Sequence, residues 1–186
     1  MFAVTDRLLL RPGWGEDAPA LSRAIADPAV VRNLSRAPWP YTLGDAEQFL
    51  ALPQTMRRPR LLIFRREGRQ PELIGGIGIH DDAEGRPELG YWIARAFWGR
   101  GYASEAGRAV MHIADEALRL SRLVASHALD NPASGRVLAK LGFAATGGTA
   151  RLHSLARGEE MEVRPHLRPR FASHATTARE PEPLAA

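Results

Sequence analysis

Cysteine is absent from this sequence of 186 residues, and lysine occurs once, as Lys140. The absence of cysteine excludes disulfide bonds, a thiolate nucleophile, and zinc or iron–sulfur sites with cysteine ligands. Arginine supplies almost all of the positive charge, since lysine and arginine together number 25. We attribute this bias to a GC-rich gene rather than to a particular binding partner.

Long apolar segments are also absent. No run approaches the roughly 20 residues that a membrane-spanning helix needs. The first seven residues, MFAVTDR, lack the basic and apolar regions of a signal peptide. Metal-ligand spacings, such as two histidines four residues apart, are missing as well. We therefore expect a cytoplasmic protein that binds neither a membrane nor a metal ion.

Positive charge does not gather in any long block. The net charge is +4, and the arginines are scattered among acidic residues. A basic protein of this kind can attract nucleic acid, anionic lipid or a phosphorylated cofactor. Without a basic block, nucleic-acid binding is the less favoured alternative, and a steep dependence of binding on salt would support it.

Length and composition fit one folded domain. Hydrophobic residues make up 45% of the sequence, enough for a sizeable core. Residues 173–186 carry no apolar face, so we predict a domain over residues 1–172 followed by a disordered tail. We expect a monomer or a homodimer.

Hydrophobic periodicity predicts an α/β fold, an α+β arrangement around a mixed sheet. The middle of the chain alternates strands with polar turns, which predicts an antiparallel meander. Further on, two helices alternate with strands, and a strand–helix–strand succession needs a parallel pair. We therefore predict a meander followed by a parallel βαβ unit. The predicted strands are 5–10, 61–64, 73–80, 88–94, 123–129, 143–146 and 161–167, and the predicted helices are 16–25, 30–34, 42–50, 102–118 and 132–141.

A glycine-rich turn joins a predicted strand to the helix that begins at Tyr102. Residues 98–106 read WGRGYASEA. The first amides of a helix have no partner within the helix, and with the helix dipole they form an anion site. Gly99 and Gly101 would let a phosphate approach the backbone closely. The alternative is a tight connection that needs glycine for its geometry alone. The motifs of P-loop and dinucleotide-binding proteins do not match.

This turn resembles the coenzyme A pyrophosphate loop of GNAT acetyltransferases. Trp98 departs from the usual first residue of that loop, but the form WGRGYA is typical of the RimJ/RimL-like branch. Residues 88–93 (ELGYWI), 131–143 (NPASGRVLAKLGF) and 38–42 (PWPYT) also resemble that branch. The resemblance spans about residues 5–171, and several ordered motifs are far more specific than one glycine loop. It implies a GNAT-like fold whose βαβ unit carries the acyl-CoA site.

The resemblance also implies which residues bind acetyl-CoA, the co-substrate. The pantetheine arm of the family runs beside the strand that precedes the loop, and the phosphates lie on the loop. The residues expected to bind the cofactor are Ile93, Ala94, Arg95, Arg100, Gly101, Tyr102, Ala103, Ser104 and Asn131. The residues expected to line the acceptor pocket are Trp39, Tyr41, His80 and Trp92, although the aromatic residues fit a core equally well.

Aminolysis of a thioester needs a base for the amine and a proton donor for the thiolate. Glu88 is the candidate base, with His80 as the alternative, and a hydrogen bond that only fixes the strand is the structural alternative for Glu88. No tyrosine follows the second motif, and the RimL-like pattern places a serine three residues after the asparagine, which here is Ser134 after Asn131. Both residues also suit the start of a helix. The glycine pair Gly75-Gly76 predicts a bulge in strand 73–80. The resemblance implies that the bulge turns an amide towards the thioester carbonyl, and the alternative is a bulge that only bends the sheet.

The resulting functional prediction is an N-acetyltransferase. It would move an acetyl group from acetyl-CoA to a primary amine, either a protein N-terminus or a small molecule, by direct attack on the thioester. The alternative is a catalytically inactive GNAT domain that binds acyl-CoA as a sensor or scaffold. Its motifs would look the same, and only turnover separates the two.

Overall fold

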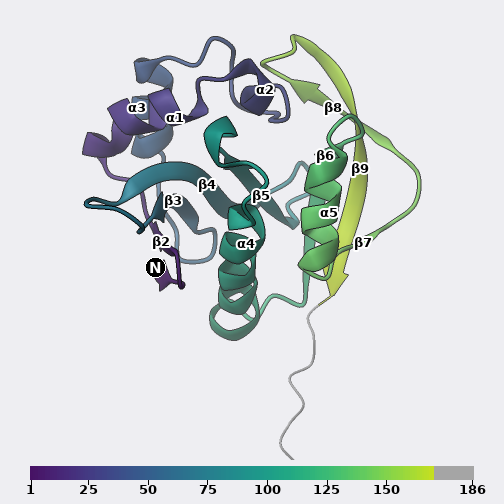
Figure 1. Ribbon diagram of the computed structural model, residues 1–186. Helices are drawn as coiled ribbons and strands as arrows, with labels where there is room; N and C mark the ends of the chain where they lie inside the picture. Colours follow the sequence, from purple (N-terminus) through teal and green to yellow (C-terminus); the bar gives the residue numbers. More distant parts are fainter. Residues whose placement is uncertain (170–186) are drawn as a thin grey trace, which may run out of the picture.

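The computed structural model describes residues 1–169, in which a single mixed sheet separates two helical layers (Figure 1). The sheet order is β1-β2-β3-β4-β5-β6-β9-β7, and β8 pairs with β9. The strands are β1 Ala3–Val4, β2 Leu8–Arg11, β3 Arg60–Arg65, β4 Glu72–Asp81, β5 Pro87–Ile93, β6 Arg122–Ala128, β7 Ala144–Ala145, β8 Ala150–Ser154 and β9 Glu159–Pro169. The predicted tail, 173–186, lies outside the described residues and stays a prediction.

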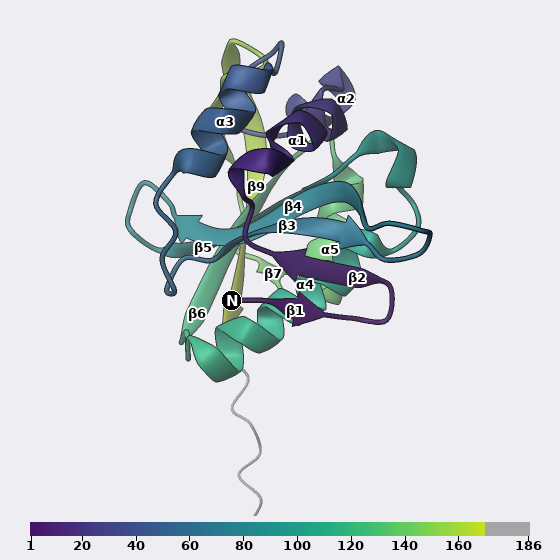
Figure 2. The same ribbon diagram turned by 90° about the vertical axis from the view of Figure 1, so that its left-hand side faces the viewer.

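The helices fall on opposite sides of the sheet. Figure 2 shows the first three helices above strands β3–β5 and α4 below them. The α-helices are α1 Ala18–Ile25, α2 Pro28–Val31, α3 Leu43–Ala51, α4 Tyr102–His112 and α5 Pro132–Lys140, and α4 continues as a π-helical turn over Ile113–Ala117. Short 3-10 helices cover Gly15–Asp17 and Arg95–Phe97.

The ends of α3 and α5 follow local capping signals in the sequence. Thr42 caps α3, with Asp45 completing a reciprocal capping box. The side chain of Asn131 accepts a hydrogen bond from the Ser134 amide at 3.3 Å and so caps α5. Gly142 follows α5 with a φ of +85°, a conformation that glycine adopts without strain.

The antiparallel meander predicted from 61–64, 73–80 and 88–94 is confirmed as β3 to β5, and β2 and β1 extend it with antiparallel pairing. Strand β5 pairs with β6 in parallel through the crossover helix α4. The crossover unit expected from strand 123–129, helix 132–141 and strand 143–146 needs a correction. Strand β7 does not pair with β6, because β9 lies between them and is antiparallel to both. Residues 163–169 of β9 pair with all seven residues of β6, whereas β7 offers only two residues. Strand β8 was not predicted, because four of its five residues are exposed and show no alternation.

The two largest hydrophobic clusters of the core lie on opposite faces of the sheet. The larger packs α4 and α5 against the sheet, around Ile79, Leu89 and Val110. The smaller packs α1 and α3 against the other face. Successive residues of β5 alternate between the two, so that Tyr91 joins the α4–α5 side and Trp92 the side of α1–α3.

Candidate active site

Strands β5 and β6 diverge and leave a cleft between them. They pair at one position only, Glu88 with Val124. Beyond it a cleft of about 1560 Å³ opens, lined by residues from β4, β5, β6 and the first turns of α4 and α5. Glu88 and Ser134 both line this cleft, on the β5 side and the α5 side respectively. The sequence motifs that lie far apart in the chain therefore meet at one place.

The predicted phosphate loop closes one end of the cleft. Gly99 and Gly101 have φ values of +75° and +82°, which a residue with a side chain rarely adopts. Helix α4 has no side-chain cap at its N-terminus, and residues 101–104 line the cleft. Unpaired amides at the positive end of a helix dipole suit a pyrophosphate. Arg100 is not among the lining residues, and its guanidinium lies 5.5 Å from the ring centre of Phe97.

Polar contacts among Thr5, Arg7 and Glu105, which we call the brace, lie behind this loop. The sequence analysis did not predict them. Glu105 of α4 accepts hydrogen bonds from Thr5 Oγ1 at 2.6 Å, Arg7 N at 3.1 Å and Arg7 Nε at 2.8 Å. Arg7 also donates to the carbonyl of Arg100 at 3.2 Å, inside the loop. Burial pushes the pKa of Glu105 upward, but these hydrogen bonds outweigh it and lower the pKa. The β1–β2 turn thereby fixes the first turn of α4.

Some of the backbone hydrogen-bonding groups at the end of β5 already have partners within the protein. The amide of Ala94 donates to the carbonyl of Ile74 at 2.8 Å, so only the carbonyl of Ala94 is left for a pantetheine arm. The indole nitrogen of Trp98 donates to the Ile93 carbonyl at 2.6 Å, which leaves that oxygen one lone pair. The side chain of Arg95 does not line the cleft and lies 3.6 Å from Asp27.

Glu88 forms a hydrogen-bonded chain with side chains from both neighbouring strands. Its Oε2 lies 3.2 Å from His80 Nε2 on β4, and its Oε1 accepts from Ser126 Oγ on β6 at 3.1 Å. Burial pushes the pKa of Glu88 upward, but the hydrogen bond and charge of His80, with the hydrogen bond from Ser126, lower it below the ordinary 4.5. Glu88 is therefore a carboxylate at neutral pH and is held in one orientation.

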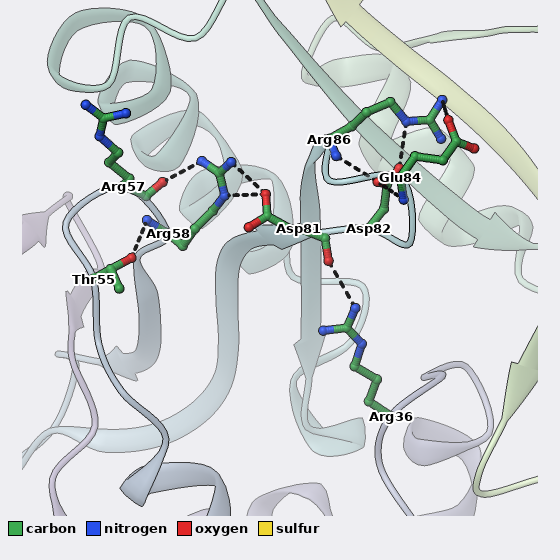
Figure 3. A network of polar contacts seen from close by, with 8 residues as sticks. All are labelled: Arg36, Thr55, Arg57, Arg58, Asp81, Asp82, Glu84 and Arg86. Atoms are coloured by element: carbon green, nitrogen blue, oxygen red, sulfur yellow. Dashed lines mark hydrogen bonds and ion pairs between the residues drawn. The ribbon is translucent and has the colours of Figure 1, made fainter.

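A polar network fixes the hairpin that carries His80 and Glu88 (Figure 3). Arg58 binds Asp81 Oδ1 through Nε at 2.8 Å, and Arg36 donates to the Asp81 carbonyl at 3.1 Å. Within the turn, Arg86 Nε donates to Asp82 at 2.7 Å. These contacts attach the β4–β5 turn to the segments before β3 and after α2. The strand ends that present the candidate base are thus held on both sides.

Ser134 contacts a tyrosine that the sequence analysis did not assign to the site. Tyr91 Oη lies 2.7 Å from Ser134 Oγ and donates to the Ser134 carbonyl at 3.1 Å. No tyrosine follows the second motif, residues 131–143, in the sequence. Tyr91 comes from β5 instead, and only the packing of α5 over the sheet brings the two residues together.

The predicted bulge in β4 is present one residue earlier than expected. Ile63 pairs with Gly75 and Phe64 with Leu73, so the extra residue is Ile74. Gly75 and Gly76 serve close packing instead, because a Cβ at Gly75 would lie 2.4 Å from the Trp92 carbonyl oxygen. A Cβ at Gly76 would meet the Trp92 indole at 2.7 Å. The amide that would polarise the thioester carbonyl stays a prediction.

Three of the four predicted acceptor residues line the cleft, namely Tyr41, His80 and Trp92. Tyr41 and Trp92 pack beside Val30 and Val31 of α2. Burial raises the pKa of Tyr41 to about 12, with the charge of Asp45 adding to the effect. Trp39 is 44% exposed and is not among the lining residues. The aromatic residues that line the cleft here are therefore Tyr41 and Trp92, without Trp39.

Residues 7–144 match the family described as the Acetyltransferase (GNAT) domain. The chain belongs to the GNAT family. An uncharacterised N-acetyltransferase of Bacillus subtilis, YoaA, is 37% identical over 150 residues, which cover 77% of this chain and 82% of YoaA. The ribosomal-protein-serine acetyltransferase of Escherichia coli is 32% identical over 81 residues, covering 42% of this chain and 45% of that protein.

Solved structures show the same GNAT fold. A GNAT-family acetyltransferase from Bacillus anthracis superposes with a TM-score of 0.76 at 22% identity, covering 91% of this chain and 98% of that one. The ribosomal-protein α-N-acetyltransferase RimL, solved in complex with coenzyme A, gives a TM-score of 0.74 at 21% identity with the same coverage. Family and fold together make this GNAT protein an acetyl-CoA-dependent acyltransferase.

No group of three or more His, Asp or Glu side chains within residues 1–169 of this GNAT protein could hold a metal ion. Within the same range, no helix is long and apolar enough to cross a membrane.

Proposed function

We propose that this GNAT enzyme transfers the acetyl group of acetyl-CoA to a primary amine by direct attack of the amine on the thioester. The observation that carries the proposal is the cleft between β5 and β6. An uncapped helix N-terminus suited to a pyrophosphate, a partly buried carboxylate and a serine hydroxyl all line it. The cytoplasmic location expected from the sequence stays a prediction.

Glu88 is the group that would receive the proton of the amine. As the amine nitrogen bonds to the thioester carbon, its excess proton passes to Glu88, directly or through a water. The lowered pKa of Glu88 makes it a weak base, so the proton continues to His80 or to solvent. The carboxylate also attracts the cationic form of the amine into the cleft.

Ser134 is the group that would protonate the sulfur. The C–S bond breaks with its electron pair on sulfur, which takes the hydroxyl proton of Ser134, and water returns a proton to Oγ. Asn131 fixes the first turn of α5 by capping it, and so fixes where Ser134 lies. Without cysteine in the sequence, no thiol acyl-enzyme can form.

The acceptor is a protein N-terminus or a small-molecule amine. The matched ribosomal-protein-serine acetyltransferase favours the first. The full chain should be incubated with acetyl-CoA and peptides that begin with serine or alanine, with amino acids and polyamines beside them. Released thiol and product mass measure transfer, and a peptide with a blocked N-terminus is the matched control. Binding of acetyl-CoA without transfer to any of these amines would favour the sensor or scaffold instead.

The role of Glu88 predicts a selective loss in Glu88→Gln, which keeps the shape and cannot accept the proton. Turnover should fall by about 10²-fold or more for a lysine-like amine and less for an α-amine, which is largely neutral near pH 8. Because the pKa of Glu88 is lowered, it contributes no acid limb between pH 6 and 9, and a rising limb there belongs to the amine. His80→Gln should be measured beside it. If Glu88→Gln kept the full rate, His80 or water would be the group that accepts the amine proton.

A further inference from the structure

The hydroxyl of Tyr91 is the second polar group at the Ser134 position. Tyr91 lies on β5 and reaches α5, where its Oη is 2.7 Å from Ser134 Oγ and 3.1 Å from the Ser134 carbonyl. Both residues line the cleft. The Tyr91 ring packs against the core beneath α4 and α5, so the position of its hydroxyl is set by that packing.

A single hydrogen on Tyr91 faces two acceptors of the same residue. If Tyr91 donates to the Ser134 carbonyl, the serine hydroxyl can donate its own hydrogen to Tyr91 Oη. In that arrangement neither hydroxyl hydrogen points into the cleft. If Tyr91 donates to Ser134 Oγ, the serine hydrogen is free to turn to the cleft. The 2.7 Å separation of the two hydroxyl oxygens is short enough for either direction. The pair therefore has two arrangements, and only the second suits a proton donor.

We propose that Tyr91 is a positioning residue that turns the Ser134 hydroxyl towards the sulfur of the leaving group. A thioester sulfur is a poor acceptor, so the resting enzyme can keep the first arrangement. As the C–S bond breaks, the negative charge on sulfur attracts the serine hydrogen, and the Tyr91 hydrogen moves from the carbonyl to Oγ. There it stabilises the charge that Oγ gains as its proton leaves. This inference rests on the proposed role of Ser134.

Tyr91 acts without giving up its own proton. Burial raises the pKa of Tyr91 to about 12, and the hydrogen bond with Ser134 lowers it only in part. The phenol therefore stays protonated throughout the pH range of the assay and serves as a hydrogen-bond donor. The proton that reaches sulfur comes from Ser134, and water replaces it, so the step balances without a tyrosinate.

A double-mutant cycle over Tyr91→Phe, Ser134→Ala and the double variant tests the inference. Tyr91→Phe should lower kcat about fivefold, the effect of one neutral hydrogen bond, and leave KM for acetyl-CoA unchanged. Ser134→Ala should lower kcat at least about a hundredfold. In the Ser134→Ala background, Tyr91→Phe should change kcat by less than about twofold, because Tyr91 acts only through Ser134.

The failures are distinguishable. If the unmodified enzyme transfers acetyl to no amine, the proposed function is wrong. If Ser134→Ala keeps full kcat, the donor role and the inference both fail. If Ser134→Ala is impaired while Tyr91→Phe has full kcat, or if the two losses multiply in the double variant, only the inference fails.

A second variant covers the case in which Tyr91→Phe does not fold. Site-specific 3-fluorotyrosine at position 91 keeps the shape of the side chain and makes the hydroxyl a stronger donor. The inference predicts that kcat changes while KM for acetyl-CoA stays constant. An unchanged kcat in a folded protein, judged by its melting temperature, would overturn the inference.

Discussion

Helices α4 and α5 both begin at the cleft, but their first turns are built in opposite ways. Helix α5 has a side-chain cap, because Asn131 accepts from the Ser134 amide, and it has a proline at its first position. Helix α4 has no side-chain cap and is preceded by two glycines with positive φ. A capped terminus is already satisfied, whereas an uncapped one retains amides for an anion. We infer that α4 binds the phosphates of the cofactor and that α5 positions a side chain.

The largest expected effect comes from placing a negative charge at the uncapped terminus. Gly101→Glu should abolish acetyl-CoA binding in a calorimetric titration, because a carboxylate and its repulsion replace the phosphate site. Gly147→Glu is the matched control. The φ of Gly147 is +85°, close to the +82° of Gly101, and a Cβ added at Gly147 would meet no atom within 4 Å. Equal affinities for the two variants would place the phosphates elsewhere.

The capped terminus should respond differently to its two polar residues. Asn131→Ala should destabilise the fold by about 1 kcal/mol through the lost cap and so lower the melting temperature. Ser134→Ala should leave the melting temperature and the acetyl-CoA affinity nearly unchanged and lower kcat. If Ser134→Ala destabilised the protein as much as Asn131→Ala and kept its kcat, α5 would hold no proton donor.

A smaller effect is expected from the brace that holds α4 from behind. Arg7→Gln removes the ion pair with Glu105, 2.6 Å in length, and the contact to the loop carbonyl of Arg100. KM for acetyl-CoA should rise about three- to fivefold, as expected for a half-exposed pair, with kcat unchanged. Arg32→Gln is the control, because it breaks a surface ion pair of 2.8 Å with Asp130 and Arg32 does not line the cleft. If KM for acetyl-CoA rose equally in the control, the brace would have no specific role in cofactor binding.

The smallest effect concerns the pH dependence of stability beneath α5. His127 Nδ1 lies 2.9 Å from His166 Nε2, and a Cβ at Gly135 of α5 would lie 2.8 Å from the His127 ring. Burial lowers the pKa of both histidines below 6.5, and the charge of Arg164 lowers them further. The unfolded chain therefore binds more protons below pH 6.5, so stability falls as the pH falls through that value.

His166→Gln should make this fall smaller by a few degrees of melting temperature between pH 7 and pH 5. His153→Gln is the control, since His153 is exposed. A slope in His166→Gln equal to that of the unmodified protein would show that other groups cause the loss.

The fold could be predicted largely from local signals. The capping pair of Thr42 and Asp45 and the glycine after α5, Gly142, are written in short stretches of sequence, and the structure has both features. The insertion of β9 between β6 and β7 could not be predicted. It depends on which strands satisfy the edge of β6, a long-range choice that periodicity does not encode.

The candidate site was predictable only in part, for the same reason. Motif resemblance led to Glu88 and Ser134, which the fold brings to one cleft. Tyr91, Ser126 and Arg7 were missed because each acts through a partner that is at least 38 residues away along the chain. A side chain whose role depends on such a partner has no local signature.

The position of β9 also determines the order in which the protein can be built on the ribosome. Strand β6 has a bare edge until residues 159–169 have been synthesised, because β9 pairs along all seven of its residues. A nascent chain that ends before residue 159 therefore exposes the edge of a strand whose residues Leu123, Ala125 and Ala128 are buried in the folded protein, and such an edge is a template for aggregation. We expect nascent chains halted just before β9 to need a chaperone, and chains extended through it to be released as folded enzyme.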